Sequence, residues 1–484
     1  MSERGLDNMR KTKIVCTIGP SCNTKEMLLK MIDAGMNVAR INMSHGNYDD
    51  LEIVFANIRN AIKESGKNVA ILLDTKGPEV RVTTFANGSA VLKEGAEFTL
   101  YKECAEGDFS GVALSYPKLV DIFFREGTGA IGRELLLDDG LISLIVREVY
   151  PDSIVCTVNK GGVLKNRKSI NIPGYYISMP YVSATDRRDI EFGLSHGANV
   201  VAASFVRNHE DVRTLRDYID SIGYEHVEII AKIENQGGVD DMDAIMDYAD
   251  GIMVARGDMG VEIPFIKLPE IQKKLIRKCV AKGKYVITAT QMLESMTTNP
   301  RPTRAEISDV ANAVYDGTSA VMLSGETAAG KFPVETIRAM AKICEETERG
   351  INYVKRFRTT NFKIKNTVDA ISHATCGMAI DIDAKAIVAC SLSGGTARMI
   401  SRFRPPVNII GLTVREKTYR QLALSWGVIP AMCEVFSSVD VLFYTGSKVA
   451  KSTLSLPDGA HIVITGGLTN GVSGNTNLIK VETV

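Results

Sequence analysis

The sequence lacks any long apolar run that could cross a membrane or direct export. No stretch approaches the roughly 18 apolar residues of a spanning helix, and the first twenty residues lack the apolar core of a signal peptide. Lysine plus arginine and aspartate plus glutamate each total 57, so the formal net charge is zero. Such a balance gives no general attraction to nucleic acid or to an anionic membrane. We therefore expect a cytoplasmic protein with no nucleic-acid or membrane partner, whose anion sites are local.

Paired cysteines are also missing. The nine cysteines are an odd number, none belongs to a CxxC pair, and most lie inside apolar runs such as KIVCTI and AIVACS. We interpret them as small buried hydrophobic side chains, which excludes a disulfide framework or a zinc site. Because single cores stop growing at about 250 to 300 residues, a chain of 484 residues predicts two or three domains.

What the sequence does contain is a repeated unit that begins at Lys13. Each unit is a short apolar, β-branched run followed by a stretch of helical period. Strands are predicted at residues 13–19, 37–42, 69–75, 199–205, 227–234, 250–258, 284–290 and 319–326, and helices at 25–34, 50–64, 186–195, 211–222, 269–281 and 333–348. Runs that are apolar on both faces are typical of parallel strands covered by helices. Eight such units predict an α/β fold built on a (β/α)8 TIM barrel.

The repeat is interrupted after the third predicted strand. Alternating apolar residues and turn signals predict a small all-β domain there, with residues 135–149 as two strands joined at Asp138-Asp139-Gly140. The junctions Gly77-Pro78 and Pro173-Gly174 are typical of hinges, so we expect a mobile lid.

A third pattern follows a basic linker at residues 354–366. A helix predicted at 368–380 precedes three apolar strands, which indicates a separate α/β domain. The predicted division is a barrel of residues 1–76 and 174–350, an inserted lid of 77–173 and a C-terminal α/β domain of 351–484.

Polar side chains gather at the C-terminal ends of the predicted barrel strands, where barrel enzymes carry their catalytic groups. Taken singly, Thr290 or Ser324 could be a helix N-cap, and Lys232 with Glu234 could be a plain ion pair. The whole set is Arg40, Asn42, Asp74, Thr75, Lys232, Glu234, Asp258, Thr290, Ser324 and Glu326. Such a set favours a functional rim in which Glu234 and Asp258 hold Mg²⁺ beside cations suited to phosphate, an arrangement typical of phosphoryl transfer.

One segment that looks like a phosphate loop is set aside. GSKVAKST at 446–453 resembles a Walker loop, but Ala450 replaces the second glycine and no strand leads directly into it. We interpret it as an ordinary helix.

Longer motifs resemble one family. TKIVCTIGP (12–20), NVARINMSHG (37–46), LLDTKGPEVR (72–81), KIENQGGV (232–239), DGIMVARGDMGVEIP (250–264), TATQMLESM (288–296) and residues 300–333 resemble pyruvate kinases, in the family's order and over essentially the whole chain. The resemblance implies transfer of the phosphoryl group of phosphoenolpyruvate to ADP, giving pyruvate and ATP, with Mg²⁺ or Mn²⁺ and K⁺ as cofactors. It also implies a TIM barrel with an inserted small β-barrel lid, a regulatory C-terminal α/β domain and a homotetramer.

The resemblance assigns the reacting groups motif by motif. Lys232 matches the lysine that stabilises the phosphoryl group in transfer, and Arg40 the guanidinium that grips the substrate phosphate. Glu234 and Asp258 match the divalent-metal ligands. Gly257, Asp258 and Thr290 match the site for the substrate carboxylate, and Thr290 and Ser324 are candidates for the proton relay to the enolate.

The resemblance also assigns a monovalent cation and the nucleotide. Asn42, Ser44, Asp74 and Thr75 match potassium ligands, and Glu79 is the residue found in potassium-dependent members, so we predict K⁺ activation. Arg81 and Lys168, with Asn42 and His45, match nucleotide contacts at the base of the lid, and closing the lid would complete the ADP site.

A possible effector site lies in the C-terminal domain. The SLSGGT motif follows a predicted strand and opens a predicted helix, so its N–H groups and hydroxyls could hold a phosphate. It resembles the family's loop for a sugar phosphate and comprises Ser391, Ser393, Gly394, Gly395 and Thr396. The alternative is a glycine-rich turn with Thr396 as N-cap. The closing loop at 466–477 is bacterial in type, which leaves the effector open between fructose-1,6-bisphosphate, AMP with another sugar phosphate, or none.

Two other functions are weighed against this one. The first is another Mg²⁺-dependent barrel enzyme, a lyase or aldolase acting on pyruvate-like enolates; the lid, the cation set and Lys232 argue against it. The second is a non-catalytic paralogue that only binds metabolites, which the intact motifs argue against. The resemblance is to bacterial members, and we expect no extra C-terminal phosphohistidine-type domain of the kind some of them carry.

Overall fold

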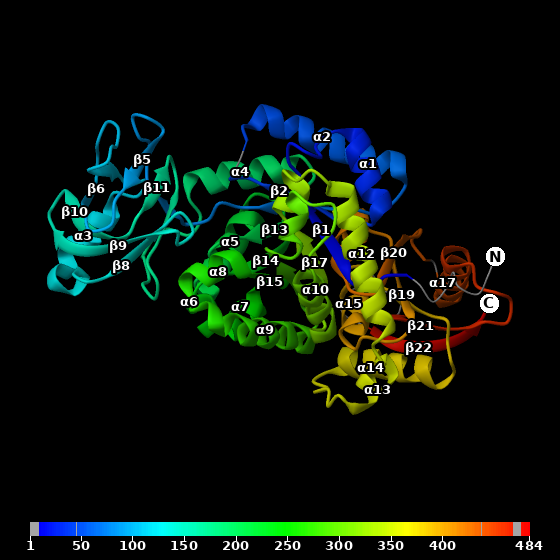
Figure 1. The fold of residues 1–484 in the computed structure, drawn as a ribbon. Coiled ribbons are helices and arrows are strands. Elements are labelled where there is room, and N and C mark those ends of the chain that lie inside the picture. Colours follow the sequence, from blue (N-terminus) through cyan, green and yellow to red (C-terminus); the bar gives the residue numbers. More distant parts are fainter. Residues whose placement is uncertain (1–8, 45, 437, 468–475) are drawn as a thin grey trace.

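A computed structural model describes residues 9–44, 46–436, 438–467 and 476–484. Figure 1 shows a barrel in the middle of the molecule, a β-rich part on one side and an α/β part on the other. His45, predicted as a nucleotide contact, and most of the predicted closing loop at 466–477 lie outside the described residues.

The barrel is closed by eight parallel strands, which confirms the predicted fold class. They are β1 (Lys13–Thr17), β2 (Val38–Asn42), β3 (Ala70–Asp74), β13 (Val200–Ala203), β14 (Glu228–Ile233), β15 (Gly251–Ala255), β16 (Tyr285–Ala289) and β17 (Ala320–Leu323). Successive strands are neighbours, and β17 pairs with β1 to close the ring, with Lys13 opposite Ala320. Each strand falls inside a run predicted from the sequence.

The period of two along β14 explains which side chains reach the barrel interior. Ile229, Ala231 and Ile233 pack outward in the core shared with the helices, whereas Ile230 packs in the core inside the barrel. Glu228, Lys232 and Glu234 have the same parity as Ile230. On the side that faces the barrel interior, β14 therefore carries Glu228 at its beginning, and Lys232 and Glu234 at its end.

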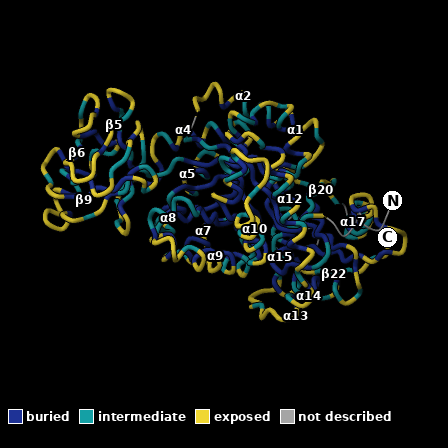
Figure 2. Tube along the Cα trace, in the orientation of Figure 1, coloured by how far each residue is buried: buried dark blue, intermediate teal, exposed yellow. Residues whose placement is uncertain are grey.

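Helices cover the outside of the barrel, and Figure 2 shows the buried strands enclosed by them. They are α1 (Lys25–Ala34), α2 (Tyr48–Ser65), α4 (Ala184–Ser195), α5 (His209–Ser221), α6 (Gln236–Asp240), α7 (Met242–Tyr248), α8 (Arg256–Glu262), α9 (Leu268–Lys282), α10 (Arg304–Asp316), α11 (Gly325–Ala328) and α12 (Pro333–Arg349). Side-chain caps define several starts: Thr24 begins α1, and capping boxes at Ser183 and Thr303 begin α4 and α10. The six predicted helices lie within two residues of the observed bounds.

The β-rich part is inserted between β3 and α4. It contains β4 (Val80–Arg81), β5 (Ser89–Leu92), β6 (Glu97–Tyr101), β7 (Gly111–Ala113), α3 (Lys118–Glu126), β8 (Glu134–Leu137), β9 (Ile142–Val149), β10 (Ser153–Lys160), β11 (Gly162–Lys165) and β12 (Ser169–Asn171). Seven strands form one sheet and β5 pairs with β11 in another, around a core of their own. The predicted hairpin is confirmed: β8 and β9 are antiparallel, and Asp138 and Asp139 between them adopt left-handed φ values of 51° and 55°.

The C-terminal part is a five-stranded sheet flanked by helices. Its strands are β18 (Ala386–Cys390), β19 (Asn408–Thr413), β20 (Val428–Met432), β21 (His461–Gly467) and β22 (Thr476–Thr483), and its helices include α14 (Thr367–Asp381), α15 (Gly395–Arg402), α16 (Glu416–Gln421) and α17 (Val439–Leu454). The Walker-like segment lies within α17, as predicted. Leu424 of this part packs inside the core of the barrel, so the sheet domain plugs one end of the ring.

Part of the predicted linker is instead a helix, α13 (Tyr353–Thr359). Phe357 is buried, with its ring 6.3 Å from that of Phe403, and this packing outweighs the polar composition that suggested a linker. The nine cysteines are free and seven are buried, which confirms that they act as small hydrophobic residues. No helix of the described residues is both long and apolar enough to cross a bilayer.

Candidate active site

A polar cavity of about 270 Å³ opens at the C-terminal ends of the barrel strands, where the inserted part begins. Most of the residues predicted for the site line it: Arg40, Asn42, Ser44, Asp74, Thr75, Glu79, Arg81, Lys168, Lys232, Glu234 and Asp258. Residues at the ends of four barrel strands, β2, β3, β14 and β15, thus meet residues of the inserted β-rich part in one place.

Asp74, at the end of β3, is the centre of a buried ionic network. Its Oδ2 accepts a hydrogen bond from Arg40 Nε at 2.6 Å, and its Oδ1 accepts one from Lys232 Nζ at 3.1 Å. Burial opposes ionisation of Asp74, but the charges of Arg40 and Lys232 hold its pKa below the ordinary value. Arg40 is further anchored by Thr17, whose hydroxyl lies 2.8 Å from Nη1. The two cations are therefore fixed in orientation toward the cavity.

The side chain of Glu234 is fully buried, and only one of its two carboxylate oxygens accepts a hydrogen bond from a described residue. Its Oε2 accepts the backbone N–H of Phe205 at 2.5 Å, and its Oε1 lies 3.1 Å from Lys232 Nζ. Oε1 makes no hydrogen bond within the described part of the chain. Burial raises the pKa of Glu234, and the neighbouring charge of Asp258 raises it further, whereas Lys232 lowers it. Two adjacent carboxylates with a spare oxygen form an arrangement that a divalent cation would stabilise.

The oxygen donors predicted for potassium lie together beside this network. Asn42 Oδ1 accepts the N–H of Ser44 at 3.0 Å, and the Thr75 hydroxyl donates to Ala202 O at 3.3 Å. With Asp74 they bring amide, hydroxyl and carboxylate oxygens to one wall of the cavity. Such a set of hard oxygen donors fits a hard cation.

The predicted nucleotide contacts are paired with carboxylates in this structure. Arg81 Nη2 lies 2.7 Å from Glu79 Oε2, and Lys168 Nζ lies 2.7 Å from Asp138 Oδ1 in the hairpin turn. Burial raises the pKa of Glu79, although Arg81 acts to lower it. Both cations line the cavity from the inserted β-rich part.

Thr290 and Gly257, both predicted for the substrate carboxylate, are hydrogen-bonded to each other. Thr290 Oγ1 accepts the N–H of Gly257 at 2.8 Å and donates to Ala289 O at 2.6 Å. Thr290 has a left-handed φ of 66°, a conformation that costs about 1 kcal/mol or more for a β-branched residue and that clusters at functional sites. Neither residue lines the cavity described above, but Gly257 is next to Asp258, which does.

Ser324 lies apart from this cavity. Its N–H donates to Glu326 Oε2 at 2.6 Å, and its hydroxyl is buried without a hydrogen-bond partner among the described residues. Glu326 also accepts the N–H of Leu293 at 3.1 Å. Glu326, which was predicted as part of the rim, therefore holds two backbone segments in place.

Sequence reasoning missed several residues of the site, above all Ser204. Its hydroxyl accepts from Lys232 Nζ at 2.8 Å and lies 3.1 Å from Asp74 Oδ1 and 2.6 Å from Thr75 O. Ser204 directly follows β13, in the position where other strands carry their functional residues, and that signal was available. Phe205, with a left-handed φ of 53°, and Thr17 were missed because their contributions are a backbone N–H and a second contact to Arg40.

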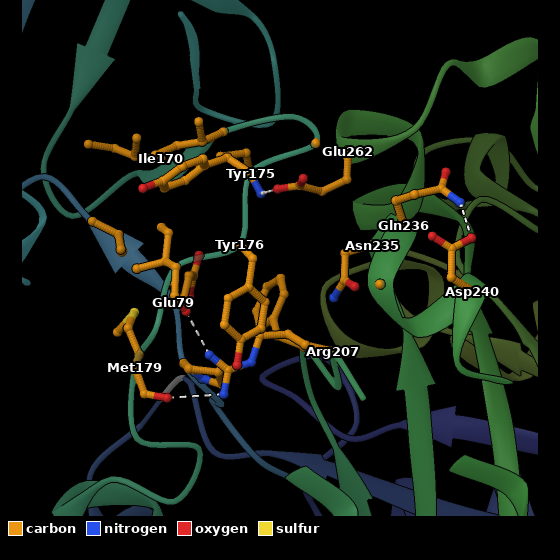
Figure 3. A pocket seen from close by; sticks show the side chains of 18 residues that line it. Glu79, Ile170, Tyr175, Tyr176, Met179, Arg207, Asn235, Gln236, Asp240 and Glu262 are labelled. Carbon is orange, nitrogen blue, oxygen red and sulfur yellow. Dashed lines mark hydrogen bonds between the residues drawn. The ribbon is translucent and has the colours of Figure 1, made fainter. Parts of the chain in front are cut away.

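A second cleft lies between the inserted β-rich part and the barrel, and Figure 3 shows its side chains. Arg207 donates to Met179 O at 3.0 Å and to Ile177 O at 2.8 Å, which ties the segment that returns from the β-rich part to the barrel. Asn171 of β12 donates to Glu262 of α8 at 2.8 Å. This bond joins the β-rich part to the helix that carries Asp258.

The predicted effector loop occupies the turn between β18 and α15. Gly394 is the N-cap, with a left-handed φ of 77°, so the alternative with Thr396 as N-cap is wrong. The Thr396 hydroxyl instead lies 2.6 Å from that of Thr476. Arg398 Nη2 donates to Ser393 O at 2.7 Å. These contacts join the loop to β22 and to α15.

Comparison with known proteins assigns the family. The profile described as "Pyruvate kinase, barrel domain" matches residues 9–337, and "Pyruvate kinase, alpha/beta domain" matches residues 369–482. A pyruvate kinase of Geobacillus stearothermophilus is 45% identical over 98% of this chain and 80% of its own length. One of Clostridium acetobutylicum is 44% identical over 98% of this chain and its full length. The crystal structure of a pyruvate kinase from Cryptosporidium parvum matches with a TM-score of 0.90 at 37% identity, covering 100% of this chain and 98% of that one. The chain belongs to the pyruvate kinase family of enzymes.

Proposed function

We propose that the enzyme transfers the phosphoryl group of phosphoenolpyruvate to ADP in the cavity at the barrel mouth, giving pyruvate and ATP. The observation that carries this proposal is the buried Lys232, held by Asp74, Glu234 and Ser204 with Arg40 beside it. Phosphoryl transfer needs a positioned donor and acceptor and neutralised charge, and these buried residues supply fixed positive charge beside the cavity. A lyase or aldolase is not favoured, since the matching relatives are pyruvate kinases.

Lys232 and Arg40 would act on the phosphoryl group. Burial lowers the pKa of Lys232, but Asp74 and Glu234 raise it above its ordinary value, which favours the charged ammonium. Arg40 is held by Asp74 through Nε and by Thr17 through Nη1. Its remaining N–H groups would grip the substrate phosphate without a cost of reorientation.

Glu234 and Asp258 would hold Mg²⁺ or Mn²⁺. The spare Oε1 of Glu234 and the repulsion between the two carboxylates support this assignment. No three His, Cys, Asp or Glu side chains cluster as a metal site in the described ranges, so substrate and water oxygens would complete the coordination. Such an ion supplies charge neutralisation and a template for the phosphate and carboxylate oxygens.

Asn42, Ser44, Asp74 and Thr75 would hold K⁺, with Glu79 nearby in the same cavity. For the nucleotide, Arg81 and Lys168 would exchange their present carboxylates for ADP phosphates, with Asn42 and His45 as further contacts. The lid, proposed to span residues 77–173 between barrel segments 1–76 and 174–350, would close over the nucleotide.

Gly257 and Thr290 would receive the substrate carboxylate, opening the hydrogen bond that now joins them. The enolate left after transfer needs a proton to become pyruvate. We assign this proton transfer to a relay of water and the hydroxyls of Thr290 and Ser324. The hydroxyl of Ser324 is buried and has no hydrogen-bond partner among the described residues, so it is available for such a relay.

Regulation and assembly complete the proposal. The loop of Ser391, Ser393, Gly394, Gly395 and Thr396, in a C-terminal domain of residues 351–484, would bind a phosphorylated effector such as a sugar phosphate or AMP. The chain would assemble as a homotetramer. Phe265 and Ile266, which are 75% and 74% exposed, are the kind of apolar surface that subunit contacts cover.

The test is production of pyruvate from phosphoenolpyruvate and ADP, followed by a coupled dehydrogenase. Lys232→Met should lower kcat by roughly two to three orders of magnitude, whereas the exposed Lys273→Met serves as a matched control and should not. Mn²⁺ binding should persist in Lys232→Met, because that change removes a positive charge 3.1 Å from Glu234. Cleavage of a 2-keto acid without nucleotide turnover would contradict the proposal, and a rate indifferent to replacing K⁺ by a bulky organic cation would remove the potassium site.

A further inference from the structure

The family resemblance assigns no role to Lys76, although this residue lines the active-site cavity together with four other cations. Each of those four lies within 2.6 to 3.1 Å of a carboxylate: Arg40 pairs with Asp74, Lys232 with Asp74 and Glu234, Arg81 with Glu79, and Lys168 with Asp138. Among the described residues, the only carboxylate at ion-pair distance from Lys76 is that of Asp189, whose Oδ2 lies 3.4 Å from Nζ. Asp189 Oδ2 makes no hydrogen bond with a described residue, so this contact is ionic only.

Asp189 keeps the Lys76 side chain beside the cavity without occupying its hydrogen-bond donors. The side chain of Asp189 is 3% exposed, and its Oδ1 accepts from the Tyr48 hydroxyl at 2.6 Å. Burial and the bond to Asp189 raise the pKa of Tyr48 to about 12, so the phenol remains the donor in this bond. The side chain of Lys76 is 39% exposed, and an ammonium has three N–H donors. These donors are available to an anion in the cavity.

The backbone on either side of Lys76 is tied to the barrel. Thr75 N–H donates to Ala202 O of β13 at 3.0 Å, and Gly77 N–H donates to Asp186 Oδ1 of α4 at 3.1 Å. Arg81 in β4 and Lys168 just before β12 belong instead to the inserted β-rich part. The cavity therefore receives cations from both parts of the chain, and the one from this barrel segment makes no hydrogen bond to a carboxylate.

We propose that Lys76 binds a phosphate group of ADP from the barrel side of the cavity, while Arg81 and Lys168 bind the nucleotide from the β-rich part. An ammonium is a compact point charge that pairs well with phosphate. Replacing the contact with Asp189 by a hydrogen bond to phosphate breaks no existing hydrogen bond, whereas Arg81 and Lys168 must each leave a carboxylate 2.7 Å away. Lys76 is thus the cation that the nucleotide can engage first. This inference rests on the proposed function, because it takes ADP as the phosphoryl acceptor.

Titration calorimetry of the full chain with ADP, Mg²⁺ and K⁺, without phosphoenolpyruvate, measures nucleotide binding in the absence of turnover. Lys76→Met should weaken ADP binding by roughly tenfold, and Lys76→Arg should recover most of the loss. Lys273→Met removes a half-exposed ammonium that pairs with Asp316 outside the cavity, and should bind ADP as the unaltered chain does. In steady-state kinetics, Lys76→Met should raise KM for ADP by a similar factor while KM for phosphoenolpyruvate stays within about twofold.

A second variant separates phosphate binding from a structural role of the ion pair. Asp189→Asn keeps an oxygen for the Tyr48 hydroxyl but removes the charge that competes for Lys76. ADP should therefore bind to Asp189→Asn at least as tightly as to the unaltered chain. If the ion pair only joined α4 to the segment after β3, Asp189→Asn and Lys76→Met would weaken ADP binding alike.

The proposal is overturned if Lys76→Met binds ADP within about twofold of the unaltered chain. It is also overturned if Asp189→Asn weakens ADP binding as much as Lys76→Met does, or if phosphoenolpyruvate binding falls by the same factor as ADP binding. An unaltered chain that binds ADP but forms no pyruvate contradicts the proposed function, whereas the comparison with Lys76→Met can still be made. A chain that binds no ADP overturns both.

Discussion

Replacing Ser204 by alanine removes one oxygen from the centre of the active-site network. The hydroxyl carries one proton, so it donates to either Thr75 O or Asp74 Oδ1 while it accepts from Lys232 Nζ at 2.8 Å. Lys232 would keep its two ion pairs, each 3.1 Å long, with Asp74 and Glu234. Losing two buried hydrogen bonds, one of them to a charged group, should cost about 1 to 3 kcal/mol of unfolding free energy.

Catalysis should suffer more than binding. With one of its three contacts gone, the Lys232 ammonium can move by a fraction of an ångström, and misplacement of this kind costs roughly tenfold to a hundredfold in rate. Ser204 acts through Lys232, so kcat should fall while KM for phosphoenolpyruvate changes little. Initial rates of pyruvate formation and a urea unfolding curve measure the two effects.

Two further serine variants serve as controls for Ser204→Ala. Ser204→Thr returns a hydroxyl and should recover much of the lost kcat. Ser195→Ala removes an exposed hydroxyl at the end of α4 whose only contacts among the described residues are Phe192 O and His196 Nδ1, and should change neither quantity. A Ser204→Ala enzyme that loses stability but keeps kcat within about twofold would refute the positioning role.

Three further predictions follow from individual contacts. Asn171→Ala breaks the bond to Glu262 and should raise KM for ADP by roughly threefold to tenfold by loosening the lid; steady-state kinetics in which only phosphoenolpyruvate is affected would argue against this. Arg402→Met leaves the buried Asp369 without the ion-pair partner that lies 2.9 Å away, and should lower the free energy of unfolding by about 3 to 5 kcal/mol. Chemical denaturation measures this loss and should show partial recovery in Arg402→Met/Asp369→Asn; a loss under about 1 kcal/mol contradicts the prediction. The hydrogen bond to Asp241 raises the pKa of His209, so this pair stabilises the fold fully below the unfolded-state pKa of about 6.5 and progressively less as pH rises through the folded value. Comparison of Tm for the unaltered chain and His209→Asn between about pH 5.5 and 8.5 should show a gap that closes at high pH, and a constant gap would refute the linkage.

The barrel could be predicted because its strands are apolar on both faces and occur at regular intervals. In the C-terminal sheet the same reasoning found β18, β19 and β21 but missed β20 and β22. Both missed strands lie at the edges of the sheet, and β20 contains Pro430, which edge strands tolerate and sequence patterns count against a strand. Helix α13 was missed because its burial depends on Phe357 meeting Phe403, a contact that no local pattern encodes.

The site was predictable to the extent that it follows the strand ends. Arg40, Asp74, Lys232 and Glu234 meet because parallel strands deliver their last residues to the same rim. The place of Ser204 directly after β13 could have been used, but its partners could not be predicted, because Asp74 and Lys232 are 130 and 28 residues away in sequence. The pairing of Lys168 with Asp138 could not be predicted either, since it depends on how the hairpin turn lies beside β12.

The pairing of β1 with β17 has a consequence for how the chain is made. Lys13 lies opposite Ala320, so the first strand of the ring waits for the last. At typical ribosomal rates of about 5 to 20 residues per second, β1 emerges roughly 15 to 60 s before its partner exists. During that interval both edges of the growing sheet are open to pairing with other nascent chains. Slower translation or loss of a chaperone should therefore reduce the yield of this enzyme, because β1 remains unpaired for longer and can pair with other chains, although the finished barrel has no free edge.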